Sequence, residues 1–212
     1  ANDEVETYTY ADFKAQSNKV ANALKDLGIQ KGERVFILSD RIPELYFSCF
    51  GILKLGAIMA PLFSAFGPEP IRERVARAEG SVIITTPKLL PKVNAIRSEL
   101  PSVRHVIVMA HREGATVADE DIDYMSIVGP ASEEFEIERT GAEDWSVMHF
   151  TSGTTGLPKG AAHVHNAIVS QYATGKYALD LHPDDIYWCT ADPGWVTGTS
   201  YGMFAPFSNG VT

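Results

Sequence analysis

The stretch of sequence that decides the fold reads Thr151-Ser152-Gly153-Thr154-Thr155-Gly156-Leu157-Pro158-Lys159-Gly160. It combines three glycines, four hydroxyl side chains and one lysine. Glycine lets backbone N–H groups approach a ligand because no Cβ stands in the way. Successive amides in such a turn bind anions, and a lysine adds a positive charge for phosphate oxygens. The stretch therefore predicts a binding loop for a polyphosphate.

The residues on either side place this loop at the end of a strand. Residues 145–150 have the aromatic and β-branched character that favours strands. Residues 161–164 look more like a second short strand than the beginning of a helix. Because ligands of open α/β sheets bind beyond the ends of strands, we expect the loop at such an edge.

The loop differs from the phosphate loop of kinases and GTPases, which reads G-x-x-x-x-G-K-[ST] and leads directly into a helix. Gly153 and Lys159 have the required separation, but Pro158 stands at the second glycine and Gly160 at the hydroxyl that would hold Mg²⁺. Without that hydroxyl and the helix, a kinase or GTPase function is disfavoured.

The loop instead resembles the signature of the adenylate-forming superfamily, which includes acyl-CoA synthetases, luciferases and the adenylation domains of peptide synthetases. The signature is [ST]-S-G-[ST]-T-G-x-P-K-G, and residues 151–160 match it at every defined position. The alternative, an ordinary surface turn rich in glycine and threonine, would not require so complete a match.

A second segment, residues 189–202, resembles the short-chain acyl-CoA synthetases, and most closely the acetyl-CoA synthetases. It reads Cys-Thr-Ala-Asp-Pro-Gly-Trp-Val-Thr-Gly-Thr-Ser-Tyr-Gly. Residues 192–195 suit a type II turn, in which Pro193 supplies a φ near −65° and Gly194 a positive φ. Such a turn would hold the Trp195 indole in a fixed pose. Taken alone, the segment could equally be a turn that carries a core tryptophan.

The residues after that turn indicate the size of the substrate. Val196 and Thr197 present a small apolar wall and a hydroxyl, which suit a very short acyl group better than a fatty chain. Gly198 leaves room for another chain or a ligand to pass close by. We therefore expect residues 195–198 to bind the substrate.

Strand and helix patterns alternate along the chain, which predicts an α/β fold with mainly parallel sheet layers flanked by helices. One helix begins after Thr9 and has Gly28 beyond its end, and another ends at Gly80. Residues 110–144 are acidic and predict an irregular excursion with one short helix near residues 122–128. The helix that ends at Gly80 spans residues 68–79. The other expected helices are 43–55, 87–99 and 166–177, and the other expected strands are 34–38, 57–63, 81–85, 103–108 and 186–189.

Composition excludes several other classes of protein. The chain has 212 residues, is 45% hydrophobic and carries a net charge of −9, which argues against a surface for nucleic acid or anionic membrane. Its first residues are acidic and polar, unlike a signal peptide. The apolar stretch 46–67 has Lys54 in its middle and is interrupted by Gly51 and Gly56, so it reads as a buried helix and strand. Cys49 and Cys189 lie far apart, which favours a reducing compartment such as the cytoplasm.

Other polar clusters are assigned no metal. The acidic run 119–123 lacks the glycine and terminal glutamate of an EF-hand and is expected to be a solvated loop. His163 and His165 would share one face of a strand, where we expect packing roles beside the site. His149 is expected to be a core or edge residue, because a carboxylate substrate is already an anion at pH 7 and needs no general base.

The resemblance implies a reaction of ATP with a small carboxylate such as acetate or propionate. Acyl-AMP and pyrophosphate form first, and coenzyme A then takes the acyl group; Mg²⁺ would help to neutralise the phosphates. Lys159 and Thr151 are the expected catalytic residues. The phosphates would be bound by Thr151, Ser152, Gly153, Thr154, Thr155, Gly156 and Lys159, and the acyl group by Trp195, Val196, Thr197 and Gly198. A medium-chain acyl-CoA ligase is the nearest alternative.

The resemblance covers residues 1–212 but only the first part of such an enzyme. We expect an N-terminal fragment of the large AMP-binding domain, without the mobile C-terminal domain, that is inactive alone and prone to self-association. A non-catalytic nucleotide-binding fragment is therefore a further alternative. The arginine motif with which acetyl-CoA synthetases bind the 3′-phosphate of coenzyme A is not recognisable in residues 100–145.

Overall fold

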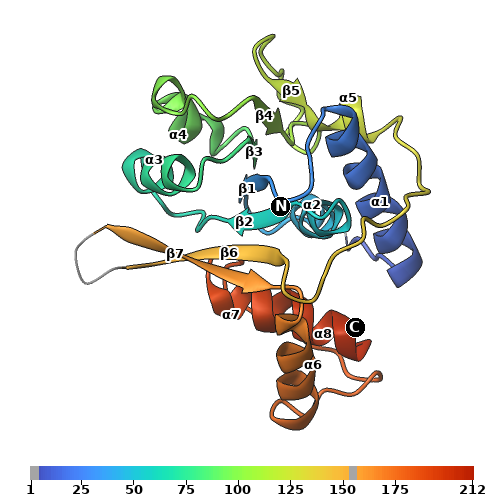
Figure 1. Cartoon of the computed structure of the whole chain (residues 1–212). Helices are drawn as coiled ribbons and strands as arrows, with labels where there is room; N and C mark the ends of the chain where they lie inside the picture. The colour runs from blue at the N-terminus through green and yellow to red at the C-terminus, as the bar shows by residue number, and fades with distance from the viewer. Residues whose placement is uncertain (1–4, 153–156) are drawn as a thin grey trace.

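The computed structural model describes residues 5–152, except for the side chain of Ser152, and residues 157–212. Its centre is a seven-stranded sheet with the strand order β5-β4-β3-β1-β2-β6-β7 (Figure 1). Neighbouring strands are parallel except for β6 and β7, which confirms the mainly parallel sheet. The strands are β1 (Arg34–Leu38), β2 (Ile58–Pro61), β3 (Val82–Thr85), β4 (His105–Val108), β5 (Ile122–Asp123), β6 (Trp145–Ser152) and β7 (Pro158–Val164).

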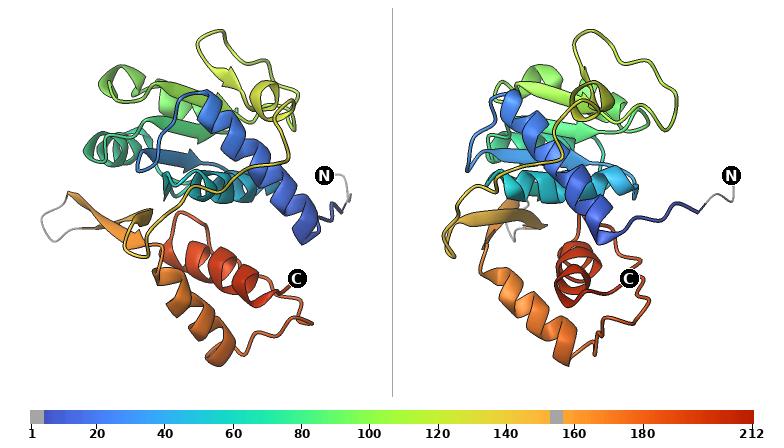
Figure 2. Two further views of the ribbon diagram at one scale, coloured as in Figure 1. Left: turned by 45° about the vertical axis from the view of Figure 1, so that its right-hand side comes forward. Right: turned by 90° about the vertical axis from the view of Figure 1, so that its right-hand side faces the viewer.

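Helices cover both faces of this sheet. Figures 1 and 2 show α1, α2 and α5 on one face and α3 and α4 on the other, with the last helices gathered beside β6 and β7. The helices are α1 (Tyr10–Asp26), α2 (Pro43–Lys54), α3 (Pro68–Arg77), α4 (Leu90–Asn94), α5 (Tyr124–Val128), α6 (Ala167–Tyr177), α7 (Val196–Thr199) and α8 (Ala205–Asn209). A 3₁₀ turn η1 (Arg97–Glu99) follows α4, and a π-helical turn η2 (Ser200–Phe204) joins α7 to α8.

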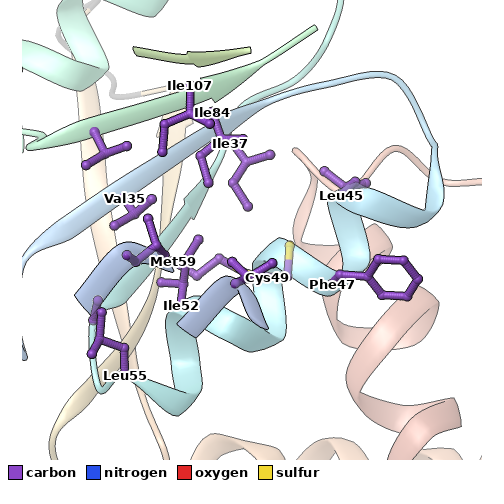
Figure 3. Packing of buried hydrophobic residues seen from close by; sticks show 14 of the residues in the cluster. Val35, Ile37, Leu45, Phe47, Cys49, Ile52, Leu55, Met59, Ile84 and Ile107 are labelled. Carbon is purple, nitrogen blue, oxygen red and sulfur yellow. The ribbon is translucent and has the colours of Figure 1, made fainter. Parts of the chain in front are cut away.

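The strands divide the core into two layers because successive side chains point to opposite faces. In β1, Val35 and Ile37 pack with α1 and α2 in the layer drawn in Figure 3. Phe36 and Leu38 pack on the other face with α3. All four are at most 1% exposed, so each contributes roughly 1.5–3 kcal/mol of hydrophobic stabilisation. The predicted strand 34–38 is confirmed.

The first helix begins and ends where its sequence predicts. The backbone N–H of Asp12 donates to Thr9 Oγ1 at 3.1 Å, and the N–H of Thr9 donates to Asp12 Oδ2 at 2.9 Å, which completes a capping box. Gly28, beyond the last turn, has a φ of +78°, a conformation that glycine adopts without strain.

The apolar stretch 46–67 forms α2 and β2, as predicted. Lys54 is half-buried, and its Nζ donates to Ser17 Oγ and Asn18 Oδ1, both at 2.7 Å, on α1. Burial lowers the pKa of Lys54 to about 8. Within residues 5–152 and 157–212, no helix is both long enough and apolar enough to cross a membrane.

The predicted helix 68–79 is confirmed as α3, which ends at Arg77 with Gly80 just beyond it. The residue with positive φ there is Glu79, and a Cβ on Gly80 would lie 2.6 Å from the Phe36 ring.

Two other predictions about local structure are wrong. The predicted helix 87–99 begins only at Leu90, so that Pro91 lies in its first turn, and it breaks before η1. Residues 186–189 form no strand, although the Tyr187 N–H donates to the Thr212 carbonyl at 2.8 Å.

The acidic run is less solvated than predicted. Asp121 is only 9% exposed, and its carboxylate is paired with Arg97, which also reaches Glu120 at 3.3 Å. The pairing lets residues 122–128 add the short strand β5 and the helix α5 to the edge of the sheet. The short helix was predicted, and the strand was missed.

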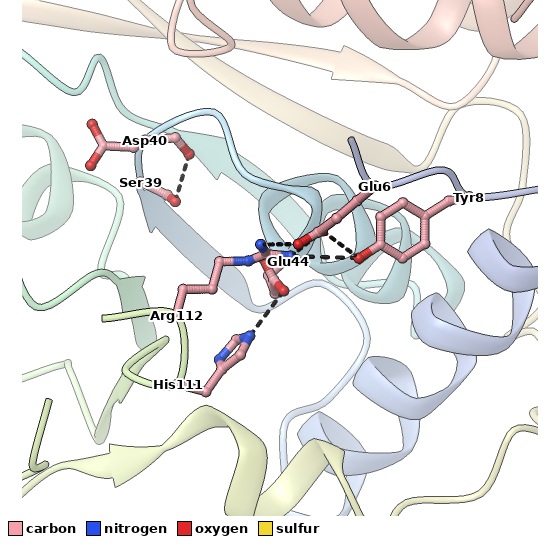
Figure 4. A network of polar contacts seen from close by, with 7 residues as sticks. All are labelled: Glu6, Tyr8, Ser39, Asp40, Glu44, His111 and Arg112. Carbon is pink, nitrogen blue, oxygen red and sulfur yellow. Dashed lines mark hydrogen bonds and ion pairs between the residues drawn. The ribbon is translucent and has the colours of Figure 1, made fainter. Parts of the chain in front are cut away.

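A polar network ties the N-terminal segment to the sheet (Figure 4). Arg112 donates from Nε to Glu44 Oε2 at 2.7 Å and from both terminal nitrogens to Glu6. Burial raises the pKa of Glu44, but the hydrogen bonds from Arg112 and His111 outweigh it, and the pKa lies below its ordinary value. The buried carboxylate therefore remains charged at pH 7.

Helices α1 and α2 are held so close that a glycine is required between them. A Cβ on Gly51 would lie 2.6 Å from Val20 Cβ and 2.9 Å from the Ser17 carbonyl oxygen. We predict that Gly51→Ala lowers the free energy of unfolding by about 1–3 kcal/mol, as overpacking does. Gly67→Ala is the control, since a Cβ there meets nothing within 4 Å; urea unfolding measures both. Equal stability of the two variants would contradict this packing.

Candidate functional site

The predicted phosphate loop lies between the two strands of a β-hairpin, β6 and β7. β6 and β7 pair antiparallel, with Thr151 opposite Lys159 and Ser152 opposite Pro158. Residues directly opposite each other point to the same face of a sheet. Thr151 and Lys159 therefore share one face, and both are exposed. The predicted phosphate-binding residues 153–156, and the side chain of Ser152, lie outside the described part of the chain.

The two faces of this hairpin contact different parts of the protein. Phe150 lies on the face opposite to Thr151, and its ring stacks on Phe36 with centroids 6.2 Å apart. His149 lies on the same face as Thr151 and is 3% exposed. Its Nε2 is 2.7 Å from Thr199 Oγ1. The face that carries Thr151 and Lys159 is thus the face on which α7 packs.

The tryptophan segment forms a turn over the predicted residues 192–195, although not of the predicted type. The N–H of Trp195 donates to the Asp192 carbonyl at 2.9 Å. The carboxylate of Asp192 accepts from the Gly194 N–H at 2.7 Å and from Ser64 Oγ at 2.8 Å. Ser64 follows the end of β2, so these bonds attach the turn to that strand. The Trp195 ring also contacts Phe63, with centroids 5.4 Å apart.

Gly194 and Gly198 both serve close packing, which corrects two predictions. Gly194 has no positive φ, so the turn is not type II. A Cβ on Gly194 would lie 2.2 Å from the backbone nitrogen of Phe63. The neighbour that passes Gly198 is the chain's own turn, because a Cβ there would lie 2.1 Å from the Asp192 carbonyl oxygen.

The predicted acyl-binding residues form the beginning of α7. Trp195 precedes its first residue and is 53% exposed, Val196 is 42% exposed, and Thr197 is exposed as well. These side chains are open to a ligand. Residues 195–197 and the hairpin lie at the same end of the sheet. β6 runs parallel to β2 with Val147 beside Met59, so both strands end there, and Ser64 beyond β2 holds the turn through Asp192.

Burial determines the charge of His149. Desolvation, and then the neighbouring His163, lower its pKa to about 4, while the backbone of Gly194 acts in the opposite direction. The two imidazoles meet edge to face with centroids 5.7 Å apart. His149 is therefore neutral at pH 7, and its position in the core confirms the prediction that it is a core residue.

His163 and His165 line a cavity of about 70 Å³ between the hairpin and the last helices, together with His149 and Thr199. Burial lowers the pKa of His165, and its Nε2 has no hydrogen-bond partner. Within the described residues, no group of three His, Cys, Asp or Glu side chains could hold a metal ion. The two histidines thus line a void beside the hairpin, and their packing role stays a prediction.

Three contributors to this edge were missed from the sequence. Phe63 and Ser64 are the second and third residues after β2. The rule that ligands bind beyond the ends of parallel strands could have found them. Arg74 on α3 lies over the ring of Phe66 at 4.3 Å and reaches the ring of Phe150 at 5.9 Å. It supports the strand from the side opposite to Thr151, a contact without a local sequence signal.

Comparison with known protein families identifies relatives along the whole chain. A family model described as "AMP-binding enzyme" matches residues 1–212. Acetyl-coenzyme A synthetase of Bacillus subtilis is 46% identical over 208 residues, which are 98% of this chain and 36% of that protein. The enzyme of the same name from Methanothrix thermoacetophila is 38% identical over 222 residues, covering 99% of this chain and 34% of that protein. The chain thus spans about a third of the length of these relatives.

Solved structures share the fold. An acyl-CoA synthetase of Brucella canis superimposes with a TM-score of 0.91 at 33% identity, over 99% of this chain and 38% of that one. An anthranilate CoA ligase in complex with anthranoyl-AMP gives a TM-score of 0.91 at 28% identity, over 98% of this chain and 39% of that one.

The depressed pKa of His149 predicts a loss of stability in acid. Because folding lowers this pKa from 6.5 to about 4, the unfolded chain binds the extra proton between these values. As the pH falls through that window, the group removes up to about 3 kcal/mol of stability, which is fully present above pH 6.5. We expect His149→Gln to reduce the slope of unfolding free energy against pH between 6.5 and 4, measured by urea titration. If the wild type and His149→Gln showed the same slope of unfolding free energy against pH, the burial of a neutral imidazole would be contradicted.

Proposed function

Since the chain belongs to the family of AMP-binding enzymes, we propose that the whole protein is an AMP-forming acyl-CoA ligase that activates acetate. The first step joins acetate and ATP to give acetyl-AMP and pyrophosphate. The second transfers the acetyl group to the thiol of coenzyme A and releases AMP. Residues 1–212 form part of its large nucleotide-binding domain, and the remaining length of its relatives would supply the rest of the site.

One observation carries this proposal most directly. The hairpin face with Thr151 and Lys159 and the turn with Trp195 lie at the same edge of the sheet, joined by the contact between His149 and Thr199. A nucleotide whose phosphates lie on the hairpin would therefore have its α-phosphorus near a carboxylate held at α7. The reaction needs this juxtaposition because acid and nucleotide react directly.

The residues of the hairpin would neutralise charge in the first step. A carboxylate oxygen attacks the α-phosphorus, and pyrophosphate leaves with the bonding electrons. Lys159 would contact the phosphate oxygens as a cation and Thr151 through its hydroxyl, while residues 152–156 would add amides and hydroxyls. No proton has to be removed from the acid, because acetate is ionised at pH 7.

The residues of the turn would hold the acyl group in both steps. Val196 offers an apolar wall to a methyl group, Thr197 a hydroxyl, and Trp195 a ring fixed against Phe63. Gly198 would act by letting α7 approach the turn. In the second step the thiol sulfur of coenzyme A bonds to the acyl carbon, and AMP leaves with one of the former carboxylate oxygens.

We propose no protein ligands for Mg²⁺ among the residues described. No cluster of three metal-binding side chains occurs in residues 5–152 and 157–212, and Gly160 stands where a kinase loop would offer a hydroxyl. Bound to the phosphates, the ion would add positive charge there. The steps above rely on the chain's own groups.

Removing the hairpin lysine tests the phosphate assignment. We predict that the whole protein catalyses acetate-dependent exchange between ATP and pyrophosphate, and that Lys159→Ala lowers kcat/KM by roughly 10²-fold or more, as loss of a charge-stabilising donor does. Lys25→Ala, which removes an exposed lysine from α1, is the control. If Lys159→Ala kept the wild-type rate of ATP–pyrophosphate exchange, the assignment of the hairpin to phosphate binding would be contradicted.

Shortening the side chain at Val196 tests the acyl assignment. Val196→Ala should raise the ratio of kcat/KM for butyrate to that for acetate by about 10-fold, the scale of added methylene space in an apolar pocket. Val169→Ala, which shortens an exposed valine of α6, should leave the ratio unchanged. A wild type active only on long-chain or aromatic acids would refute acetate as the substrate but keep the ligase class.

A further inference from the structure

We propose that His149 is a positioning residue that fixes the single turn of α7 through the hydroxyl of Thr199. It would thereby tie the proposed acyl-binding residues 195–197 to β6, the strand that carries Thr151. The proposal rests on the proposed ligase function, because it concerns the residues assigned to the acyl group there. Neither His149 nor Thr199 belongs to the phosphate loop or to the predicted acyl contacts.

The contact joins two buried side chains at the boundary between β6 and α7. His149 Nε2 lies 2.7 Å from Thr199 Oγ1, and the two residues are 3% and 1% exposed. Thr199 Oγ1 also lies 3.0 Å from the Val196 carbonyl oxygen. In the tautomer that carries the imidazole proton on Nε2, the ring donates to the hydroxyl and the hydroxyl donates to that carbonyl. The chain of bonds runs from β6 through Thr199 to Val196.

The polar pair is not needed to fill the core. The neighbouring position on the same face of β6 is the apolar Val147, 4% exposed. Burying an imidazole and a hydroxyl is unfavourable unless they bond to each other. A leucine at position 149 would pack without that requirement, so the pair points to a need for a fixed geometry.

The first turn of α7 has little support of its own. The helix has only four residues and continues as the π-helical turn η2, where the regular pattern of hydrogen bonds is broken. The cavity of about 70 Å³ lies directly beside Thr199. Packing around Thr199 is therefore incomplete on that side. The bond to His149 supplies a restraint from the side of the sheet.

This restraint couples the two halves of the site. Thr151 follows His149 by two residues on the same strand and the same face, while Val196 is the residue whose carbonyl Thr199 holds. A nucleotide that fixes the position of β6 and β7 would thus also fix residues 195–197. By the reciprocity of coupled binding, an acid bound at residues 195–197 would favour the same position of β6 and β7.

The test uses four variants of the whole protein. His149→Leu and Thr199→Val remove the bond while roughly keeping side-chain volume, whereas His149→Gln keeps a donor near Nε2 and Thr199→Ser keeps the hydroxyl. Hydrogen exchange is measured for peptides that cover residues 190–204 and, as an internal control, for α1. The KM values for acetate and ATP are measured in ATP–pyrophosphate exchange.

We expect His149→Leu and Thr199→Val each to speed amide exchange in residues 196–199 by about 10-fold, in line with the loss of one buried hydrogen bond. Each should raise the KM for acetate by a similar factor and change the KM for ATP by less than about 2-fold. The double variant should be no worse than either single one. His149→Gln and Thr199→Ser should stay close to wild type, which a general loss of packing would not explain.

The outcomes separate the two proposals. Unchanged amide exchange in residues 196–199 of His149→Leu and Thr199→Val would overturn the positioning role, whatever the activity. Faster exchange throughout α1 and α7 alike would also overturn it, because it would indicate general destabilisation. A wild type without any acid-dependent ATP–pyrophosphate exchange would instead refute the proposed function, while the amide exchange of the variants would still decide the role of His149.

Discussion

The parallel pairing of β6 with β2 sets the geometry of the entire edge where the site lies. With Val147 beside Met59, both strands deliver their following residues to the same side of the sheet. The end of β2 supplies Phe63 and Ser64, which hold the tryptophan turn. The end of β6 supplies the hairpin. Backbone pairing thus places β2 and β6 side by side, although more than 80 residues of sequence separate Pro61 from Trp145.

The alternation of side chains along β6 then gives each face a separate task. Phe150 faces Phe36 and Arg74, so one face is anchored in the core. His149 and Thr151 face α7, so the other face meets the segment that we propose binds the acyl group. A shift of one residue in the pairing would exchange these roles, because side chains alternate with a period of two. The apolar contacts of Phe150 thus hold the register on which the polar face depends.

Much of this arrangement follows from local sequence, and the exceptions have a common cause. The N-cap at Thr9, the strand 34–38 and the two strands on either side of the predicted phosphate loop are each encoded by adjacent residues, and the structure confirms them. Gly194 was misread because its conformation is ordinary and its smallness serves the approach of Phe63, a residue far away in sequence. The contact of His149 with Thr199 spans 50 positions. No periodicity reports such a contact, since it arises only when the sheet and α7 have packed.

A crystal structure of the whole protein with an alkyl ester of AMP, which imitates the acyl adenylate, tests the central claim most directly. The claim is that one ligand extends from the hairpin face to the beginning of α7. The short alkyl group should then lie within about 4 Å of Val196 and Thr197, with the phosphate on the side of β6 that carries Thr151. An alkyl group bound away from α7, or a phosphate on the Phe150 side of the strand, would contradict it.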